Sequence, residues 1–439
     1  MSSTETTAPA GTLTATPRRP HTPPHTPPRA QPSAGPRTLD AVFAAAARDW
    51  PCAVAVRDDA GALTYGRAQA RATQLATALV RRGVQLGDPV VVHCQDHRQT
   101  LVAHLAVLRA GAVCVPVPGE LRGPALRRIA ELSGAPQVLC SAATRPRWQH
   151  RADALVLDDD ATWTRINALR PDPSLPRSGP TDAAYLLIAD PRGPDTRGHL
   201  VDHRAFGFCA DARTAALGGP AGRVAVRQAP GGQRALSAMW WAFAGGGALL
   251  GRGDDAALLE SLTGGGTRSA VLSAGEYTAV LDLLARAPRP AGPRGGPGSV
   301  VLLGAPCPDE LARRHFDLLP GTRLLAEFAP VDGVMPWTAR ELTAHDAPSG
   351  AGHAVGAVLP HVRARVQDPD GRPLAAGHSG EVCATGAALP FDTVSPPDRA
   401  FTPGEAAGSL LRSGRLGRLA PDGALHLLDP LNCRSGAAR

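Results

Sequence analysis

The sequence contains no lysine, and all 46 of its Lys or Arg positions are arginine. Chemistry that needs a lysine ammonium from this chain is therefore excluded. The formal net charge of +7 would suit a nucleic-acid ligand, but the arginines are scattered, and no basic stripe with interleaved aromatic residues occurs. We therefore expect no nucleic-acid partner.

Aromatic residues are scarce, at 4% of the chain, so the core must consist largely of Ala, Val and Leu. Neither an apolar run of about 18 residues nor a signal-peptide pattern is present, and we expect a cytoplasmic protein without a membrane partner. The eight cysteines form no C-x-x-C pair. Most lie in apolar runs such as 113–115, which predicts small buried side chains in a reducing compartment rather than a metal site.

Composition divides the chain into four parts. Residues 1–37 are rich in Pro and Thr with almost no large apolar side chains, which predicts a disordered tail. Its repeat HTPPHTPP is either a proline-rich docking motif or part of a passive tail. Residues 38–349 have the pattern of an α/β core. Residues 350–432 contain short strand patterns joined by Asp-Gly turns, which predicts a β-rich subdomain, and 433–439 form a short C-terminal tail.

Within the core, apolar strand patterns alternate with amphipathic helical patterns. The strand DPVVVHCQ is followed by the helix QTLVAHLAVLRAGA and the strand VCVPVP. The alternation returns with the strand AAYLLIA, a helix around MWWAFAGGGALL, the helix GEYTAVLDLLARA, and the strand SVVLLG before the helix PDELARRHFDLL. Such alternation predicts βα units and a largely parallel sheet.

The loop ADPRGPDTRG lies between an apolar strand pattern and a helix expected to open near Val201. Strand, loop and helix in this order are the setting in which phosphate-binding loops occur. The loop residues oppose that chemistry, because Pro191 and Pro194 have no N–H to donate. Asp190 and Asp195 would in addition repel an anion. The pattern raises the question of whether this loop once bound ATP.

Two motifs, LTYGRAQARA at 63–72 and VLRAGAVCVPVPGE at 107–120, match framework motifs of one family, with Arg109 in place of a lysine. The stretch YLLIADPRGPDTRGHLVDHRAF aligns without a gap on a third motif of that family. On these residues the chain resembles the adenylate-forming, AMP-binding superfamily, specifically the adenylation domains of nonribosomal peptide synthetases. The resemblance covers roughly residues 38–432. It implies an α/β fold, the N-terminal core of an adenylate-forming enzyme, with two βαβ-type sheets packed with helices plus a small distorted β-barrel.

The resemblance implies a site for ATP or AMP with Mg. The family's phosphate-binding loop is altered in this chain. The family's Ser-Gly-Ser-Thr-Gly, whose hydroxyls and amides hold the β- and γ-phosphates, corresponds to residues 190–194. Arg197 stands at the position of the phosphate-binding lysine, and Gly198 is kept. The resemblance therefore marks Arg197 and Gly198 as remnants of a degenerate ATP site.

The adenine and metal positions of the family are altered as well. Phe328 replaces the tyrosine that stacks on adenine and is followed by Ala329, while Gly304 belongs to the retained framework motif VVLLGAPCPDEL. Asp332 replaces the magnesium-binding glutamate, and the ribose-binding aspartate is Arg415. Asp332 is therefore the candidate metal ligand, and the alternative is a structural aspartate.

Two further departures concern the substrate and the catalytic lysine. The family's Phe-Asp-x-Ser grips the substrate amine, but this chain has no acidic residue between Val224 and Arg252 in that region. We therefore expect no carboxylate there for an ammonium group. The chain ends at LLDPLNCRSGAAR, where the family continues into a C-terminal subdomain that carries the adenylation lysine. The resemblance thus implies an N-terminal core that lacks the C-terminal subdomain.

These departures favour a pseudoenzyme with no catalytic residue assigned. It would act as a partner or scaffold for a biosynthetic enzyme or carrier protein in a nonribosomal peptide or secondary-metabolite pathway. The alternative is a divergent ATP-dependent acyl- or aminoacyl-adenylate-forming ligase that is completed in trans by a lysine-bearing subdomain.

Three side chains allow both a structural and a functional interpretation. His203 is either a cap or packing residue at the start of a helix or a base. Trp240 and Trp241 either line the former substrate pocket or belong to the core.

Overall fold

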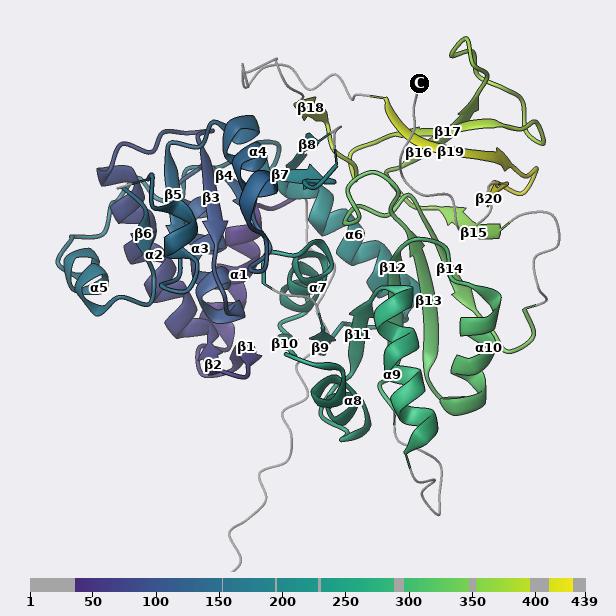
Figure 1. The fold of residues 1–439 in the computed structure, drawn as a ribbon, viewed down its shortest axis with the longest axis horizontal. Coiled ribbons are helices and arrows are strands. Elements are labelled where there is room, and N and C mark those ends of the chain that lie inside the picture. Colours follow the sequence, from purple (N-terminus) through teal and green to yellow (C-terminus); the bar gives the residue numbers. More distant parts are fainter. Residues whose placement is uncertain are drawn as a thin grey trace, which may run out of the picture.

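The chain is described by a computed structural model that covers residues 36–151, 153–193, 196–227, 230–287, 296–346, 353–394 and 410–428. Two sheets and their helices form adjoining halves of one molecule (Figure 1). Residues 1–35, with the HTPPHTPP repeat, and the tail at 433–439 lie outside the described residues. The expectations of a disordered tail and a docking motif therefore stay predictions.

The smaller sheet comes mainly from the first half of the chain. Neighbouring strands run parallel except at β8 and β18, which are antiparallel. In spatial order its strands are β18 (Asp392–Val394), β8 (Arg197–Asp202), β7 (Ala183–Ala189), β4 (Val113–Pro116), β3 (Pro89–His93), β5 (Gln137–Cys140) and β6 (Leu155–Val156).

The larger sheet has a parallel centre and antiparallel ends. In spatial order its strands are β16 (Arg363–Gln367), β17 (Gly380–Thr385), β19 (Leu411–Leu419), β20 (Ala424–Leu427), β15 (His353–Val358), β14 (Thr338–Leu342), β13 (Arg323–Phe328), β12 (Ser299–Gly304), β11 (Ser269–Leu272), β9 (Arg223–Val226), β10 (Ala248–Gly251), β1 (Val54–Asp58) and β2 (Gly61–Thr64).

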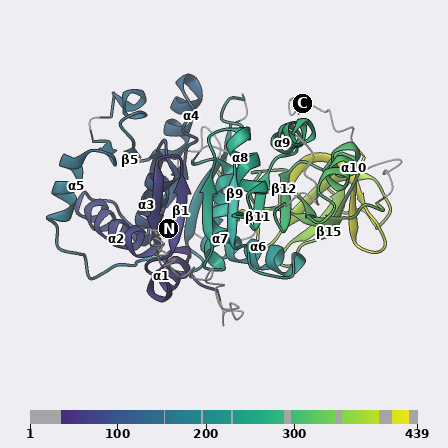
Figure 2. The same cartoon turned by 90° about the horizontal axis from the view of Figure 1, so that it is seen from below.

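Helices cover the sheets in three layers (Figures 1 and 2). Between the sheets, one large apolar cluster joins α1 (Leu39–Asp49), α2 (Tyr65–Arg81), α3 (His97–Arg109), α6 (His203–Ala216) and α7 (Gln233–Ala244). The outer face of the larger sheet is covered by α8 (Asp255–Thr263), α9 (Ala274–Arg286) and α10 (Asp309–Leu318). On the smaller sheet lie α4 (Gly123–Ser133) and a short 3₁₀ helix at Arg145–Trp148, while α5 (Asp160–Asn167) lies beside α2.

The helices begin where a side-chain oxygen can accept a hydrogen bond from the first free amide groups. Thr38 and Thr64 cap α1 and α2, and Asp96 and Asp202 cap α3 and α6. Ser273 and Glu276 form a capping box at α9. The strands expected at DPVVVHCQ, VCVPVP, AAYLLIA and SVVLLG are confirmed as β3, β4, β7 and β12. The helices expected at QTLVAHLAVLRAGA, GEYTAVLDLLARA and PDELARRHFDLL are confirmed as α3, α9 and α10. Among the described residues, no helix has both the length and the apolar character needed to span a bilayer.

The structure corrects two expectations about local order. The loop after β7 does not lead directly into a helix, because β8 intervenes and pairs antiparallel with β7 before α6 begins at His203. The expected helix around MWWAFAGGGALL stops at Ala244, and the residues after the glycines form β10. Three consecutive glycines end the helix, and Gly246 has a φ of +65° that other residues rarely adopt.

The strands that follow residue 350 extend both sheets. β15 pairs with β14, and β18 pairs with β8 of the other sheet. The expected small barrel takes the form of an open antiparallel extension, because the described strands of the larger sheet end at β16 without closing. The division into a core at 38–349 and a β-rich subdomain at 350–432 stays a prediction.

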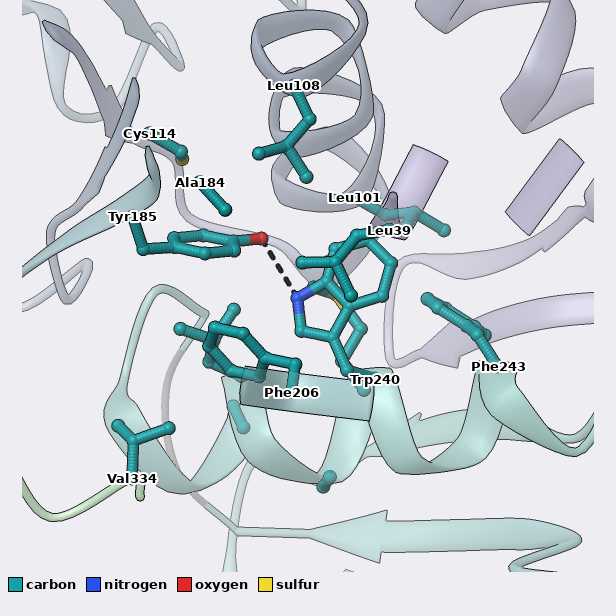
Figure 3. Close-up of a cluster of buried hydrophobic side chains, with 14 of the residues drawn as sticks. Leu39, Leu101, Leu108, Cys114, Ala184, Tyr185, Phe206, Trp240, Phe243 and Val334 are labelled. Atoms are coloured by element: carbon teal, nitrogen blue, oxygen red, sulfur yellow. Dashed lines mark hydrogen bonds between the residues drawn. The ribbon is translucent and has the colours of Figure 1, made fainter. Parts of the chain in front are cut away.

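The two tryptophans of α7 belong to the core. Trp240 and Trp241 are 2% and 1% exposed. The indole N–H of Trp240 donates to the Tyr185 hydroxyl over 2.9 Å, as Figure 3 shows, and that hydroxyl lies 3.3 Å from Nδ1 of buried His104. This chain of polar groups joins α7, β7 and α3 inside an apolar cluster, which supports the core interpretation of both tryptophans.

Replacing Tyr185 with phenylalanine should lower the free energy of unfolding by about 1–3 kcal/mol, because the indole N–H of Trp240 stays buried without an acceptor. Urea denaturation followed by tryptophan fluorescence measures the loss. A change below about 0.5 kcal/mol would contradict the assigned role of this hydrogen bond.

Candidate functional site

The loop between β7 and β8 is closed by its own carboxylate. Asp190 has a φ of +40°, and its Oδ1 accepts a hydrogen bond from the Gly193 amide over 3.0 Å. The same amide also lies 3.0 Å from the Asp190 carbonyl oxygen, and the Thr196 hydroxyl donates to that carbonyl. A side chain at Gly193 would meet the Asp190 carboxylate, since an ideal Cβ there lies 1.9 Å from Oδ2. The loop thus holds an anion that belongs to the chain itself.

Arg197 and Gly198 open β8, in the smaller sheet. Arg197 is exposed, whereas Gly198 is buried between Ile188 of β7 and Val394 of β18. A Cβ at Gly198 would lie 2.7 Å from Cδ1 of Leu186, so close packing alone requires this glycine. Arg197 therefore remains the accessible member of the pair.

Gly304, Phe328 and Ala329 lie together at the carboxyl ends of β12 and β13. Gly304 pairs with Phe328 across the two strands, and the Ala329 amide donates to the Gly304 carbonyl over 2.9 Å. The Phe328 ring is 4% exposed and meets Trp337 edge to face at 6.5 Å. The structure thus brings these three predicted residues together, and it places Arg197 and Gly198 on the other sheet.

A cavity of about 420 Å³ adjoins Phe328 on the α10 side of the larger sheet. Its lining includes Ala305, Pro306, Cys307 and Arg340, together with residues 343, 344 and 346. Arg340 is held there by an ion pair with Asp346. Carboxyl ends of parallel strands are a common place for ligands in open α/β sheets.

Asp332 follows this edge but points into the protein. It is 2% exposed, and its Oδ1 accepts hydrogen bonds from the Val334 and Met335 amides, both over 2.7 Å. Burial raises its pKa to about 6, and the two amide hydrogen bonds act in the opposite direction. Oδ2 has no partner among the described residues. Asp332 therefore stabilises its own turn.

The surroundings of Asp332 do not fit a magnesium ion. Mg²⁺ usually keeps several water molecules and takes carboxylate oxygens from an open site. One oxygen of Asp332 is used by backbone amides, and its side chain is almost fully covered. In the part of the chain that the structure describes, no group of three His, Cys, Asp or Glu side chains could hold a metal ion.

One buried ion pair involves residues that no family motif marked. Arg213 of α6 and Glu327 of β13 form a two-pronged ion pair, with Nε to Oε1 at 2.9 Å and Nη2 to Oε2 at 2.5 Å. Both side chains are 1% exposed. Nη2 also donates to the Ser237 hydroxyl on α7 over 3.0 Å, and the guanidinium lies 5.0 Å from the Trp241 ring.

The expectation of no carboxylate for an ammonium concerned residues 224–252, and Glu327 lies outside that segment. Glu327 arrives from β13, a strand distant in sequence, because α6 and α7 pack on the larger sheet beside it. It is not free to bind an ammonium, since Arg213 already satisfies both of its oxygens. A single acidic residue inside the apolar stretch LLAEFA was the only sequence signal.

His203 is a packing and capping residue. It is fully buried, and its Nδ1 accepts a hydrogen bond from the Leu39 amide at the start of α1 over 3.1 Å. Burial lowers its pKa to about 4, although Asp40 and Asp182 act in the opposite direction. The neutral ring therefore joins α6 to α1, which agrees with the structural interpretation.

The comparisons with known proteins agree with this fold. The model of the AMP-binding enzyme family matches residues 43–187. Tenellin synthetase of Beauveria bassiana is 27% identical over 429 residues, which cover 89% of this chain and 10% of that protein. Phosphinothricin tripeptide synthetase PhsC of Streptomyces viridochromogenes is 28% identical, covering 89% of this chain and 36% of PhsC. The chain thus spans well under half the length of these relatives.

Solved structures show the same architecture. The nonribosomal peptide synthetase FmoA3 matches with a TM-score of 0.76 and 22% identity, over 92% of this chain and 43% of FmoA3. FmoA3 has also been solved with AMPPNP bound. The N-terminal subdomain of NpsA from Klebsiella oxytoca, in complex with 3-hydroxybenzoyl-AMSN, matches with a TM-score of 0.71 and 17% identity, over 90% of this chain and 100% of that one.

Replacing Glu327 with alanine should lower the free energy of unfolding by about 3–5 kcal/mol, because Arg213 would remain buried without a counterion. The double variant R213M/E327L should recover most of that loss, since it removes both charges. Equilibrium urea denaturation measures both variants. A loss below about 1 kcal/mol for E327A would contradict the buried pairing.

Acid should destabilise the fold through buried neutral histidines. Burial lowers the pKa of His93, His199 and His203 to about 4 and that of His104 to about 3. The unfolded chain takes up these protons near pH 6.5, so stability should fall by about 1.4 kcal/mol per pH unit for each histidine between there and pH 4. Asp332 has the opposite effect and offsets the contribution of one histidine, because its raised pKa stabilises the folded state as the pH falls.

The urea midpoint measured from pH 7.5 down to pH 5 tests this dependence. His199→Gln should reduce the slope by one histidine's share, whereas His150→Gln, at an exposed site, should leave it unchanged. A slope that is equal in both variants would contradict the assignment.

The retained motifs, the match of residues 43–187 to the AMP-binding enzyme family and the shared architecture agree: the chain is similar to nonribosomal peptide synthetase adenylation domains and has the fold of the N-terminal subdomain of adenylate-forming enzymes.

Proposed function

We propose that this chain is a catalytically impaired adenylation-domain-like protein of a nonribosomal peptide or secondary-metabolite pathway, where it serves as a partner or scaffold for a biosynthetic enzyme or carrier protein. The family reaction joins an acyl carboxylate to the α-phosphate of ATP and releases pyrophosphate. It depends on groups that spread negative charge as pyrophosphate leaves. The proposal rests on how this chain has replaced those groups.

The closed loop at Asp190 carries the proposal. An incoming phosphate needs free amide N–H groups and a positive field. The Gly193 amide is instead bound to the Asp190 carboxylate, so a phosphate would have to displace a charged hydrogen bond and approach a negative group. Both effects weaken ATP binding in the same direction.

Two other features support impaired chemistry. The resemblance places the metal ligand at Asp332, but this side chain is turned inward and one of its oxygens accepts hydrogen bonds from backbone amides. These surroundings do not favour a bound Mg²⁺ ion. Arg213 and Glu327 satisfy each other against α7, where the family binds its substrate. The charges that could contact ATP, metal and substrate are thus used within the fold.

One observation favours the second candidate, a divergent adenylate-forming ligase completed in trans by a lysine-bearing subdomain. Phe328, which pairs with Gly304, lines a cavity of about 420 Å³, so an adenine ring could stack there. The N-terminal subdomain of NpsA is solved in complex with an acyl-AMSN ligand, which supports acyl-adenylate binding by this part of the fold.

Calorimetric titration with pyrophosphate and ATP tests the proposal. The unmodified protein should bind both only weakly, and Asp190→Ser should raise the affinity by roughly ten- to a hundredfold, because a charge-assisted hydrogen bond of about 1.5–3 kcal/mol no longer occupies the amide. Asp172→Ser, which removes a similar carboxylate-to-amide bond to Ser174 in a distant loop, should have no effect. Tight ATP binding by the unmodified protein would contradict the proposal.

An acyl-sulfamoyl-adenosine titration separates the two candidates. Absence of binding agrees with a partner or scaffold role, whereas tight binding that Phe328→Ala abolishes would favour the ligase.

A further inference from the structure

A second concave surface lies on the outer face of the larger sheet, away from the cavity at the carboxyl ends of β12 and β13. It is a groove of about 850 Å³ lined by residues of β1, β9, β10 and α8 and by the loop at 264–268. These elements lie together at the lower end of the molecule in Figure 1. Val54, Ala248 and Leu250 are apolar residues of its lining, which we call the apolar floor. We call it the arginine groove.

Four arginines line the arginine groove: Arg57, Arg223, Arg252 and Arg268. Arg57, Arg223 and Arg268 are exposed and Arg252 is half-exposed. Across the described ranges of the chain, none of these guanidinium groups takes part in an ion pair or a side-chain hydrogen bond. Arg227, by contrast, forms an ion pair with Asp255 on α8.

The acidic residues at the arginine groove do not neutralise it. Asp59 and Glu260 are the acidic side chains in its lining, against the four arginines. The lining therefore carries a surplus of positive charge, with no aromatic side chain among its residues. Exposed unpaired guanidinium groups around an apolar floor suit a ligand with carboxylates and apolar groups.

The strand register places the arginines in two pairs. Arg223 is opposite Ala248, and the Arg223 carbonyl accepts a hydrogen bond from the Arg268 amide. Arg57 is opposite Leu250, and Arg252 lies two residues further along. Positions 248, 250 and 252 share one face of the strand. At about 3.3 Å per residue, positions 248 and 252 are separated by roughly 13 Å along β10 and the residue that follows it.

This spacing selects the kind of ligand. A single phosphate group needs donors that converge on one point, whereas these pairs stand at opposite ends of an apolar floor. A nucleic acid strand would present charge throughout and would favour aromatic stacking, for which the lining has no residue. An acidic polypeptide segment with apolar residues between two carboxylate clusters matches both the charges and the floor.

We propose that the arginine groove binds an acidic segment of a partner protein, with carboxylates at its two ends and apolar side chains on Val54, Ala248 and Leu250. This binding site would give the partner role proposed above a defined surface. It rests on that proposed function only because both require a protein partner. It makes no use of the β7–β8 loop or of Phe328.

The test uses a fluorescein-labelled peptide of sequence DELVLED, whose two glutamates lie about 13 Å apart when the peptide is extended. Fluorescence polarisation with the full chain should show binding at about 50 mM NaCl that weakens strongly at about 300 mM, because exposed charges are screened. The variant R57E/R252E should weaken binding by about tenfold or more. R127E/R286E, which makes the same change in net charge on α4 and α9, should stay within about twofold.

A peptide of the same composition in scrambled order, and a single-stranded DNA oligonucleotide, complete the experiment. Weaker binding of both supports the proposal. It would be overturned by no binding of DELVLED at low salt, by equal losses in the two double variants, or by stronger binding of the DNA. Arg252→Gln serves as a milder variant should R57E/R252E fail to fold, with a loss of about threefold expected. ATP titration of the same variants should be unchanged, so failure of this proposal is distinct from failure of the proposed function.

Discussion

The ion pair between Arg213 and Glu327 is the constraint on which the interior of this molecule depends. Two opposite charges at 1% exposure must satisfy each other, because either one alone would be strongly destabilising in an apolar interior. Through Ser237 and Trp241 the pair also fixes α7 against α6 and β13. The pair thus adds a charged contact at a defined position to the helix layer between the two sheets, which is otherwise packed mainly through apolar side chains.

The same principle recurs at the edges where a nucleotide would bind. Asp190 binds an amide of its own loop, and Asp332 binds two amides of its own turn. Polar groups that could contact a ligand are thereby used to hold the fold. The resemblance to adenylation domains persists in the framework, and the proposed partner role supposes that residues at the family's ligand positions now serve internal contacts.

Much of the fold could be predicted from the sequence, because capping residues and apolar periodicity are local signals. Thr38, Thr64 and Ser273 mark helix starts without reference to distant residues. The phosphate loop could be recognised as altered, but its closure by Asp190 could not, since that depends on a φ of +40° and on β8 following the loop. Glu327 escaped notice because its partner lies 114 positions away on α6.

The most direct test of impaired adenylation is ATP–pyrophosphate exchange across a panel of amino acids and aryl acids. It is measured with the purified chain alone and again with an added lysine-bearing C-terminal subdomain of a related synthetase. We expect no exchange above background in either case, because Asp190 binds an amide of the β7–β8 loop and Arg213 and Glu327 satisfy each other beside α7. Acid-dependent exchange that appears on adding the subdomain would contradict it and would establish a ligase completed in trans.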